Sequence, residues 1–344
     1  MQRSSIRTFI RNNRIFQYTA VLAFLLLALF AGISAGAVSI PFMDIVKMIS
    51  KQGRPLNGVD PSTVSILMEI RLPRVLLAGF VGASLALAGG AFQGLLRNPL
   101  ADPYTLGVSS GASVGAVSAI YFGINIFGIY TLPVFSIAAG ALTMGCVLFI
   151  SYAAQKRTSM ETLILAGVIA NSFLGAIISL IIALTGDEIR EVMNWLLGSV
   201  SMRGWPYVKM ILPFLISGSI VLLMQARELN AFAFGEERAH YIGVKVKNKQ
   251  IMIIIAASVL TGSAVAVSGA IGFVGLVIPH IIRFLYGTDH RHLLPLSMLT
   301  GAGFLMLSDL LARTIISPGE LPIGVITAII GAPVFAAILF ANRK

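Results

Sequence analysis

The fold is decided by residues 71–112, which read RLPRVLLAGFVGASLALAGGAFQGLLRNPLADPYTLGVSSGA. Between Arg74 and Arg97 this stretch holds twenty-two residues without a charge. That is about the length at which an α-helix crosses a bilayer core roughly 30 Å thick. The stretch therefore predicts a membrane-spanning helix over 72–95.

Small residues recur at every fourth position along this helix and again along the segment after it. A stripe of this kind gives a helix a flat face where a second backbone can approach closely. Between the two segments, Pro99 and Pro103 remove backbone donors and force a tight non-helical turn. We expect two closely packed helices that face protein rather than lipid. The packing residues are Gly82, Ala86, Gly90, Gly94, Gly107, Gly111 and Gly115.

The composition of the 344-residue chain is that of a polytopic membrane protein. Hydrophobic residues make up 57% of it and charged residues 11%, and its mean hydropathy is +0.89, which is too apolar for one soluble core. In such a protein the net charge of +11 bears on which side of the membrane each loop lies. We therefore expect lipid as a partner, and not nucleic acid. The single cysteine, Cys146, excludes an internal disulfide, and we expect it to be buried as a small apolar residue.

Apolar runs between charges and prolines predict an all-α protein with about ten transmembrane helices in one permease domain, residues 1–344. The run at 273–286 is short for a full crossing, and Gly269, Gly272 and Gly275 indicate irregular backbone there, which is tolerated only inside protein or beside water. The predicted spans are 17–39, 72–95, 106–124, 131–154, 161–185, 206–226, 250–269, 273–286, 293–315 and 321–341.

The distribution of basic residues predicts that both termini are cytoplasmic. The basic amino terminus precedes an apolar run longer than a signal peptide has, so we expect an uncleaved first span. With this end inside, the inner segments hold sixteen of the 25 basic residues, in agreement with the positive-inside rule. The segments 41–71 and 185–206 are then the longest outer connections, and 227–249 is the longest inner one.

Several motifs resemble the permease subunits of ABC importers for ferric siderophores, haem and cobalamin, the FecCD-type subunits of type II importers. They are RLPR, AGGAFQGLLRNPLADPYTLGVSSGA, WLLGS, IGFVGLVIPH, TDHR and ELPIGVITA, and the likeness covers about residues 60–340. The resemblance implies a multi-pass protein of the bacterial cytoplasmic membrane that takes a ferric siderophore or similar iron chelate from an extracytoplasmic binding protein. Haem or cobalamin is the alternative cargo. It also implies a second permease chain, identical or paralogous, and two ATPase subunits that carry ATP and Mg²⁺.

The chain has no motif for chemistry of its own. There is no G-x-x-x-x-G-K-[ST] phosphate loop, no H-E-x-x-H and no G-x-S-x-G, so we expect a transport subunit without catalytic residues, cofactor or metal site. A transporter driven by an ion gradient stays an alternative. It would need charged groups inside several spans, where only Asp309 is found.

The inner segment 227–249 carries apolar residues among its charges. Gly235 and Gly243 bound a short helix, which is unstable alone and must rest on something. It either tucks under the membrane domain or docks a cytoplasmic partner. The family resemblance implies that this segment seats the ATPase subunit, through Gly235, Glu236, Arg238, Ala239, Ile242 and Gly243.

On the outer side, Arg71 and Arg74 flank a proline and offer guanidinium groups that suit carboxylates, although snorkelling explains such arginines equally well. The resemblance implies that Arg71, Arg74 and Arg313 dock the binding protein. An i,i+4 pair with Asp309 is a second account of Arg313.

At the inner side, the resemblance implies that Asn98 and Leu100 form the cytoplasmic gate. The sequence leaves the roles of Asp309, Asn171 and Gln93 open.

Overall fold

The computed structural model describes residues 13–36, 45–46, 50, 60–155, 160–316 and 319–341. Within these ranges the chain is helical and contains no strand. Both predicted cytoplasmic ends and most of the first outer connection lie outside the described residues. The elements in chain order are α2 (Arg14–Ser34), α4 (Pro61–Ser65), the π-helix η1 (Ile66–Arg71), α5 (Leu72–Leu95), the 3-10 helix η2 (Pro103–Leu106), α6 (Val108–Tyr121), the 3-10 helix η3 (Gly128–Tyr130), α7 (Thr131–Gln155), α8 (Met160–Leu184), α9 (Ile189–Leu196), α10 (Trp205–Met224), α11 (Ala226–Phe232), α12 (Glu236–Tyr241), α13 (Val246–Ser268), α14 (Val274–Tyr286), α15 (His290–Thr314) and α16 (Ile323–Ala341).

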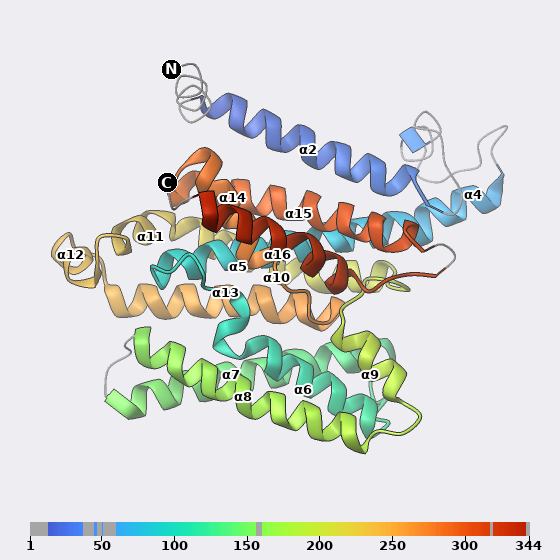
Figure 1. The fold of residues 1–344 in the computed structure, drawn as a ribbon, viewed down its shortest axis with the longest axis horizontal. Helices are drawn as coiled ribbons and strands as arrows, with labels where there is room; N and C mark the ends of the chain where they lie inside the picture. Colours follow the sequence, from blue (N-terminus) through green and yellow to red (C-terminus); the bar gives the residue numbers. More distant parts are fainter. Residues whose placement is uncertain are drawn as a thin grey trace.

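The described residues confirm the all-helical membrane class. Seven helical segments are long and apolar enough to cross a bilayer, those of α2, α5, α7, α8, α10, α13 and α15. Three shorter apolar helices, in α6, α14 and α16, occupy the remaining predicted segments. Figure 1 shows the long helices side by side, with α12 at one end of the bundle and α4 and α9 at the other.

Helix α5 lies at the centre, and its glycines explain how other helices enclose it. Nearly every residue from Pro73 to Leu95 is buried. A Cβ at Gly82 would collide with the carbonyl oxygen of Gly301 on α15, and one at Gly89 would collide with the backbone of Gly275 on α14. Because both positions lack a side chain, the neighbouring backbones come close enough to cover α5 completely.

Helices α6 and α7 form a second close pair. A Cβ at Gly111 would collide with Thr143 of α7, and one at Gly115 with the carbonyl oxygen of Phe135. Gly107, just before α6, has a φ of +84°, a left-handed conformation that favours glycine. The small-residue stripe of the second segment thus lies against α7.

The break before α14 is irregular backbone inside protein, as predicted. Gly269 and Phe273 both have a φ of +70°. Between them, Ile271 is buried and makes two hydrogen bonds with the Tyr104 hydroxyl. That hydroxyl donates to the Ile271 carbonyl at 2.6 Å and accepts from its N–H at 3.0 Å. A side chain from η2 therefore replaces the helical hydrogen bonds that the break removes.

The prediction that Cys146 is buried was wrong. Cys146 is exposed on α7, and its neighbours Leu142 and Phe149 have 71% and 72% of their surface exposed. Burial against protein is the rule for apolar residues in water. In a bilayer the hydrocarbon is itself an apolar surrounding, so this face of α7 needs no protein cover.

Candidate functional site

A buried cluster of charges lies at the end of the bundle away from α12. Asp309 of α15 is fully buried, and its carboxylate accepts from Arg74 of α5 at 2.9 Å. Arg313 lies one turn further along α15, with its Nε 3.5 Å from the same carboxylate. Arg74 also donates to Glu320 at 2.8 Å. Two arginines and two acids thus neutralise one another where an unpaired charge would be costly.

The third predicted arginine joins this cluster through the end of α2. Arg71 is 5% exposed and donates to the carbonyl oxygens of Ile33 and Ser34 at 3.2 and 3.3 Å. Arg313 donates to the carbonyl of Gly32 in the same turn. Cations suit the carboxyl end of a helix, where carbonyl groups lack partners. The structure therefore brings the three arginines together, with each engaged inside the chain. The predicted i,i+4 contact of Arg313 with Asp309 is present.

A polar cavity of about 350 Å³ adjoins this cluster. Glu191, Asn194 and Trp195 of α9 line one side of it, and Arg203 and Glu320 contribute from following segments. The Trp195 indole nitrogen is buried without a hydrogen-bond partner. This end of the bundle thus offers a partly open chamber of mixed polar and apolar lining, with two acids in its wall, beside the arginines.

At the opposite end, the turn between α5 and η2 is tightly wound. Arg97 has a φ of +51°, and the Asn98 side chain accepts from the N–H of Leu100 at 2.9 Å. Asn98 and Leu100, the predicted gate residues, are both exposed. The guanidinium of Arg97 lies 3.7 Å from where a Cβ of Gly235 would be, so this turn adjoins the start of α12.

The predicted short helix between Gly235 and Gly243 is α12. Both glycines have positive φ, +102° and +90°, which few other residues would tolerate. Ala239 is fully buried and Glu236 accepts from Gln250 at 2.9 Å, so one face of α12 is held to the bundle. The other face is exposed and mixes charged and apolar side chains. Its exposed residues are Glu237, Arg238, His240 and Tyr241 (86%), with Ile242 (70%) and Phe234 (68%) beside them.

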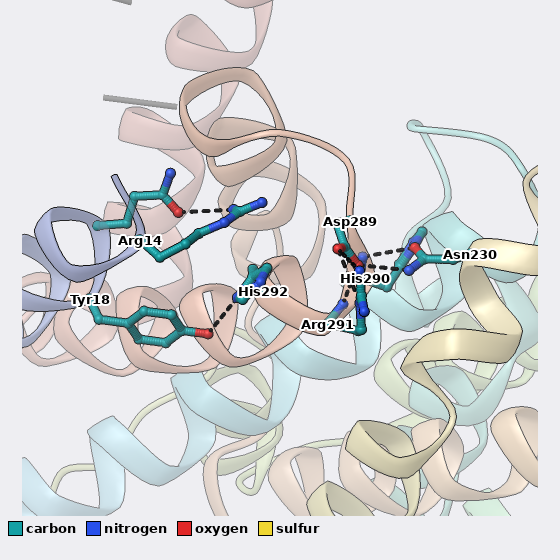
Figure 2. A network of polar contacts seen from close by, with 8 residues as sticks. Arg14, Tyr18, Asn230, Asp289, His290, Arg291 and His292 are labelled. Atoms are coloured by element: carbon teal, nitrogen blue, oxygen red, sulfur yellow. Dashed lines mark hydrogen bonds and ion pairs between the residues drawn. The ribbon is translucent and has the colours of Figure 1, made fainter. Parts of the chain in front are cut away.

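A polar network ties α11 to the start of α15, as Figure 2 shows. The Asn230 amide donates to Asp289 at 2.7 Å, and its oxygen accepts from the His290 backbone N–H at 2.9 Å. The ring Nδ1 of His290 lies 2.8 Å from that oxygen. Hydrogen bonds from Arg291 hold the pKa of the Asp289 carboxyl well below its usual range.

Two neighbours extend the network. The His290 ring fills the space beside Gly94 of α5, so α11, α15 and α5 meet at this point. The Tyr18 hydroxyl of α2 lies 3.2 Å from Nδ1 of His292 (Figure 2). Sequence reasoning missed this network, although Asp289 before a helical run is a typical N-cap.

The two amides that the sequence left open join helices. Gln93 donates to the Leu276 carbonyl at 3.0 Å and accepts from Arg283 at 3.0 Å. Asn171 of α8 donates to the Tyr104 carbonyl at 3.0 Å and accepts from Ser110 at 2.7 Å. Among the described residues there is also no group of three or more side chains that could hold a metal ion.

The fold and the two ends of the bundle define a multi-pass helical permease. The chain belongs to the FecCD transport family, whose model matches residues 24–341. The resemblance seen in the motifs is thereby confirmed, and the chain is an ABC importer permease of this family. The alternative of an ion-driven transporter finds no support.

Three relatives give the scale of the similarity. An uncharacterized ABC transporter permease protein of Bacillus subtilis (strain 168), YvrB, is 57% identical over 348 residues, covering 100% of this chain and 99% of the relative. The cobalamin import system permease protein BtuC of Halobacterium salinarum is 44% identical over 287 residues, 83% of this chain and 76% of the relative. A solved inward-facing ABC transporter, assigned to the metal-chelate type, is 33% identical with a TM-score of 0.83, covering 94% of this chain and 98% of that one. Further relatives, 37 to 40% identical, are permeases for hemin, molybdate and ferric dicitrate.

Proposed function

We propose that this chain carries a ferric siderophore or similar iron chelate across the bacterial cytoplasmic membrane, with ATP hydrolysed on separate ATPase chains. The observation that carries the proposal is the group of exposed apolar side chains at α12, namely Phe234, Tyr241 and Ile242. A six-residue helix held on one side, with Tyr241 and Ile242 exposed on the other, has the shape of a docking element. The chain has no phosphate loop, so the ATPase must be a partner.

The docking test replaces Ile242→Asp and measures how much ATPase subunit copurifies with the permease. We expect at least a tenfold loss, because a carboxylate cannot enter an apolar interface unpaired. The matched control is Met202→Asp, since Met202 is 98% exposed at the other end of the bundle. Equal copurification of wild type and Ile242→Asp would refute docking at α12.

The contacts around α12 support a route from ATPase to gate. Asn230 in α11, just before α12, is hydrogen bonded to Asp289 and His290, and His290 lies against Gly94 near the end of α5. Three residues after Gly94 comes Arg97 and then the turn with Asn98 and Leu100. A shift of α11 and α12 on ATP binding would therefore reach that turn through packed groups, which is how rigid elements carry such changes.

At the outer end, we assign Arg71, Arg74 and Arg313 to docking of the binding protein by an exchange of partners. Arg74 now holds Glu320, whose side chain is 38% exposed, so an incoming carboxylate could take its place. Glu320→Gln should then raise the affinity for the binding protein severalfold, because the competing charge is gone while Asp309 remains. Glu191→Gln is the control, and unchanged or weaker capture by Glu320→Gln would count against the exchange.

Cargo is tested by growth of a deletion strain on a ferric siderophore, haem or cobalamin as the limiting nutrient. We expect growth on the ferric siderophore to depend on this chain. Cobalamin is the second candidate because the halobacterial relative, at 44% identity, is a cobalamin permease. Growth that depends on the chain only with cobalamin would replace the first assignment by the second.

We also propose that a second permease chain, identical or paralogous, lies on the other side of the transport pathway.

A further inference from the structure

A surface groove between α7, α10 and α13 has no part in the features described so far. Its deeper part is a cavity of about 280 Å³ at the middle of these helices, lined by Met144, Phe214 and Gly262 among others. A second hollow of about 500 Å³ continues along α10 and α13 to Asn248. The two share Ile255 and Val259, so together they form one groove with almost wholly apolar walls.

The groove is open beside Gly145 of α7, and its length fits one leaflet. A Cβ added at Gly145 would meet nothing within 4 Å, so the space beside α7 is open. From Asn248 to Gly262 the rise along α13 is about 21 Å at 1.5 Å per residue. Half of the hydrocarbon core is roughly 15 Å deep. The groove therefore runs from the membrane surface to about its middle, the reach of one acyl chain.

A cation adjoins the surface end of the groove, since Lys247 directly precedes the lining residue Asn248. The Lys247 ammonium lies 5.4 Å from the centre of the Tyr152 ring, which places it across the gap between α13 and α7. Lys247 is exposed, and none of the described carboxylates pairs with it. The nearby Lys249, by contrast, is paired with Glu228 at 2.8 Å. Lys247 thus offers a positive charge that lies beside an aromatic ring and that no carboxylate of the described residues neutralises.

We propose that one anionic phospholipid binds in this groove, with its phosphate at Lys247 and an acyl chain along α13. Basic residues at the end of an interhelical groove recognise anionic headgroups, while the apolar walls take the chain. The charge selects the headgroup, and the length selects a lipid over a short apolar ligand. This site is independent of the cargo and of the ATPase.

The test uses the full chain, with any subunits that copurify, in nanodiscs of equal phosphatidylglycerol and phosphatidylcholine. Native mass spectrometry then counts the lipids retained after gentle release. We expect wild type to retain phosphatidylglycerol over phosphatidylcholine at least fivefold at about one site per chain. Lys247→Gln should abolish that preference, and Gly145→Leu, which fills the groove, should remove retention of both lipids.

The matched controls lie outside the groove. Lys209→Gln removes an exposed lysine of α10, and Gly186→Leu enlarges a glycine whose Cβ would also meet nothing within 4 Å. Both should behave as wild type, and all variants must keep the wild-type thermal transition. Equal retention of the two lipids by wild type, or an unchanged preference in Lys247→Gln, overturns the proposal. So does efficient joining of two chains through Cys146 by a short bifunctional maleimide, because a second copy would then cover this face.

Discussion

Asp309 shows how a single buried acid organises the end of the bundle away from α12. It receives Arg74 from α5 at 2.9 Å, and Arg313 of its own helix lies 3.5 Å away. In a low-dielectric surrounding each ion depends on its partner, so the loss of one group leaves another charge exposed to apolar surroundings. The contacts of this carboxylate thus hold α5, α15 and, through Arg313, the end of α2 in register.

Asp309→Ala should therefore destabilise the protein strongly, by about 3 to 5 kcal/mol, because it leaves two buried arginines short of their partner. Thermal unfolding in detergent measures this as a fall in Tm. Asp187→Ala, which removes an exposed acid from an outer connection, should leave Tm within error of wild type. A similar Tm for both variants would mean that the cluster does not stabilise the fold.

The Asp289 carboxyl predicts a specific pH dependence. Its pKa is lowered in the folded protein by hydrogen bonds from Arg291, so the ionised form stabilises the fold above the unfolded pKa of about 3.9. This contribution is lost as the pH falls toward the lower folded value. The difference in Tm between wild type and Asp289→Asn should stay constant from pH 8 to pH 5 and shrink below about pH 4. A gap that closes already at pH 6 would assign the effect to a histidine instead.

Sequence reasoning found the site residues that local spacing or family motifs reveal. The i,i+4 relation of Asp309 to Arg313 is readable from a helix, and it was right. The pairing of Arg74 with Asp309 and Glu320 joins residues more than two hundred positions apart, and no periodicity reports it. The same holds for Asn230 with Asp289, which are 59 positions apart.

At the scale of elements, α5 is a buried axis on which other helices pack through missing side chains. Its regularly spaced glycines lie on one face of the helix. Nearly all of its surface is nevertheless buried, because α10, α13, α14 and α15 contact it on several sides. Such an interface relies on backbone proximity and tolerates little added volume.

Gly89→Ala should lower the free energy of unfolding by about 1 to 3 kcal/mol. The new Cβ would collide with the backbone of Gly275, which cannot rotate away as a side chain can. Gly175→Ala on α8 is the matched control, since a Cβ there would meet nothing within 4 Å. Fluorescence-detected size exclusion after a heat step compares the two. Equal survival would show that α5 and α14 can move apart without cost.

Asn230→Ala should uncouple ATP hydrolysis from transport with little loss of stability. The variant removes the hydrogen bonds from α11 to the start of α15, so the proposed shift of α12 would no longer reach α5. We expect ATP hydrolysis within twofold of wild type in proteoliposomes, with the transported cargo per ATP reduced at least fivefold. A proportional fall in both rates would indicate a role in assembly instead.

The predicted spans differ in how closely their limits agree with the observed helix ends. Helix α5 begins and ends at the predicted residues, whereas α13 and α15 begin three or four residues earlier than expected. Their first turns hold Lys247 and Arg291, which end an apolar run without ending a helix. Asp289 caps α15 through its side chain, so the helix starts there.

For the whole molecule, the two ends of the bundle are chemically different. The α12 end carries the tight turn with Asn98 and Leu100 and the exposed apolar side chains Phe234, Tyr241 and Ile242, and the far end carries the arginine cluster and the cavity beside it. A transport subunit needs such asymmetry, because its partners approach from opposite sides of the membrane. Figure 1 shows how far apart the two ends lie along the helices.

The orientation can be tested with cysteines in a Cys146→Ala background. Met202→Cys at the outer end should react with a membrane-impermeant maleimide in intact cells, and Tyr241→Cys on α12 only after lysis. Both residues are highly exposed, 98% and 86%, so lack of reaction reports the side of the membrane. The reverse pattern would invert the proposed topology.

The enclosure of α5 also constrains how the protein is made. This helix leaves the ribosome early, but α13, α14 and α15, which pack on it, are synthesised much later. Until they arrive, its glycine face can meet only lipid or the few helices already inserted. A nascent chain that stops before α13 would therefore expose an unfinished surface, which membrane proteases and insertion chaperones can recognise.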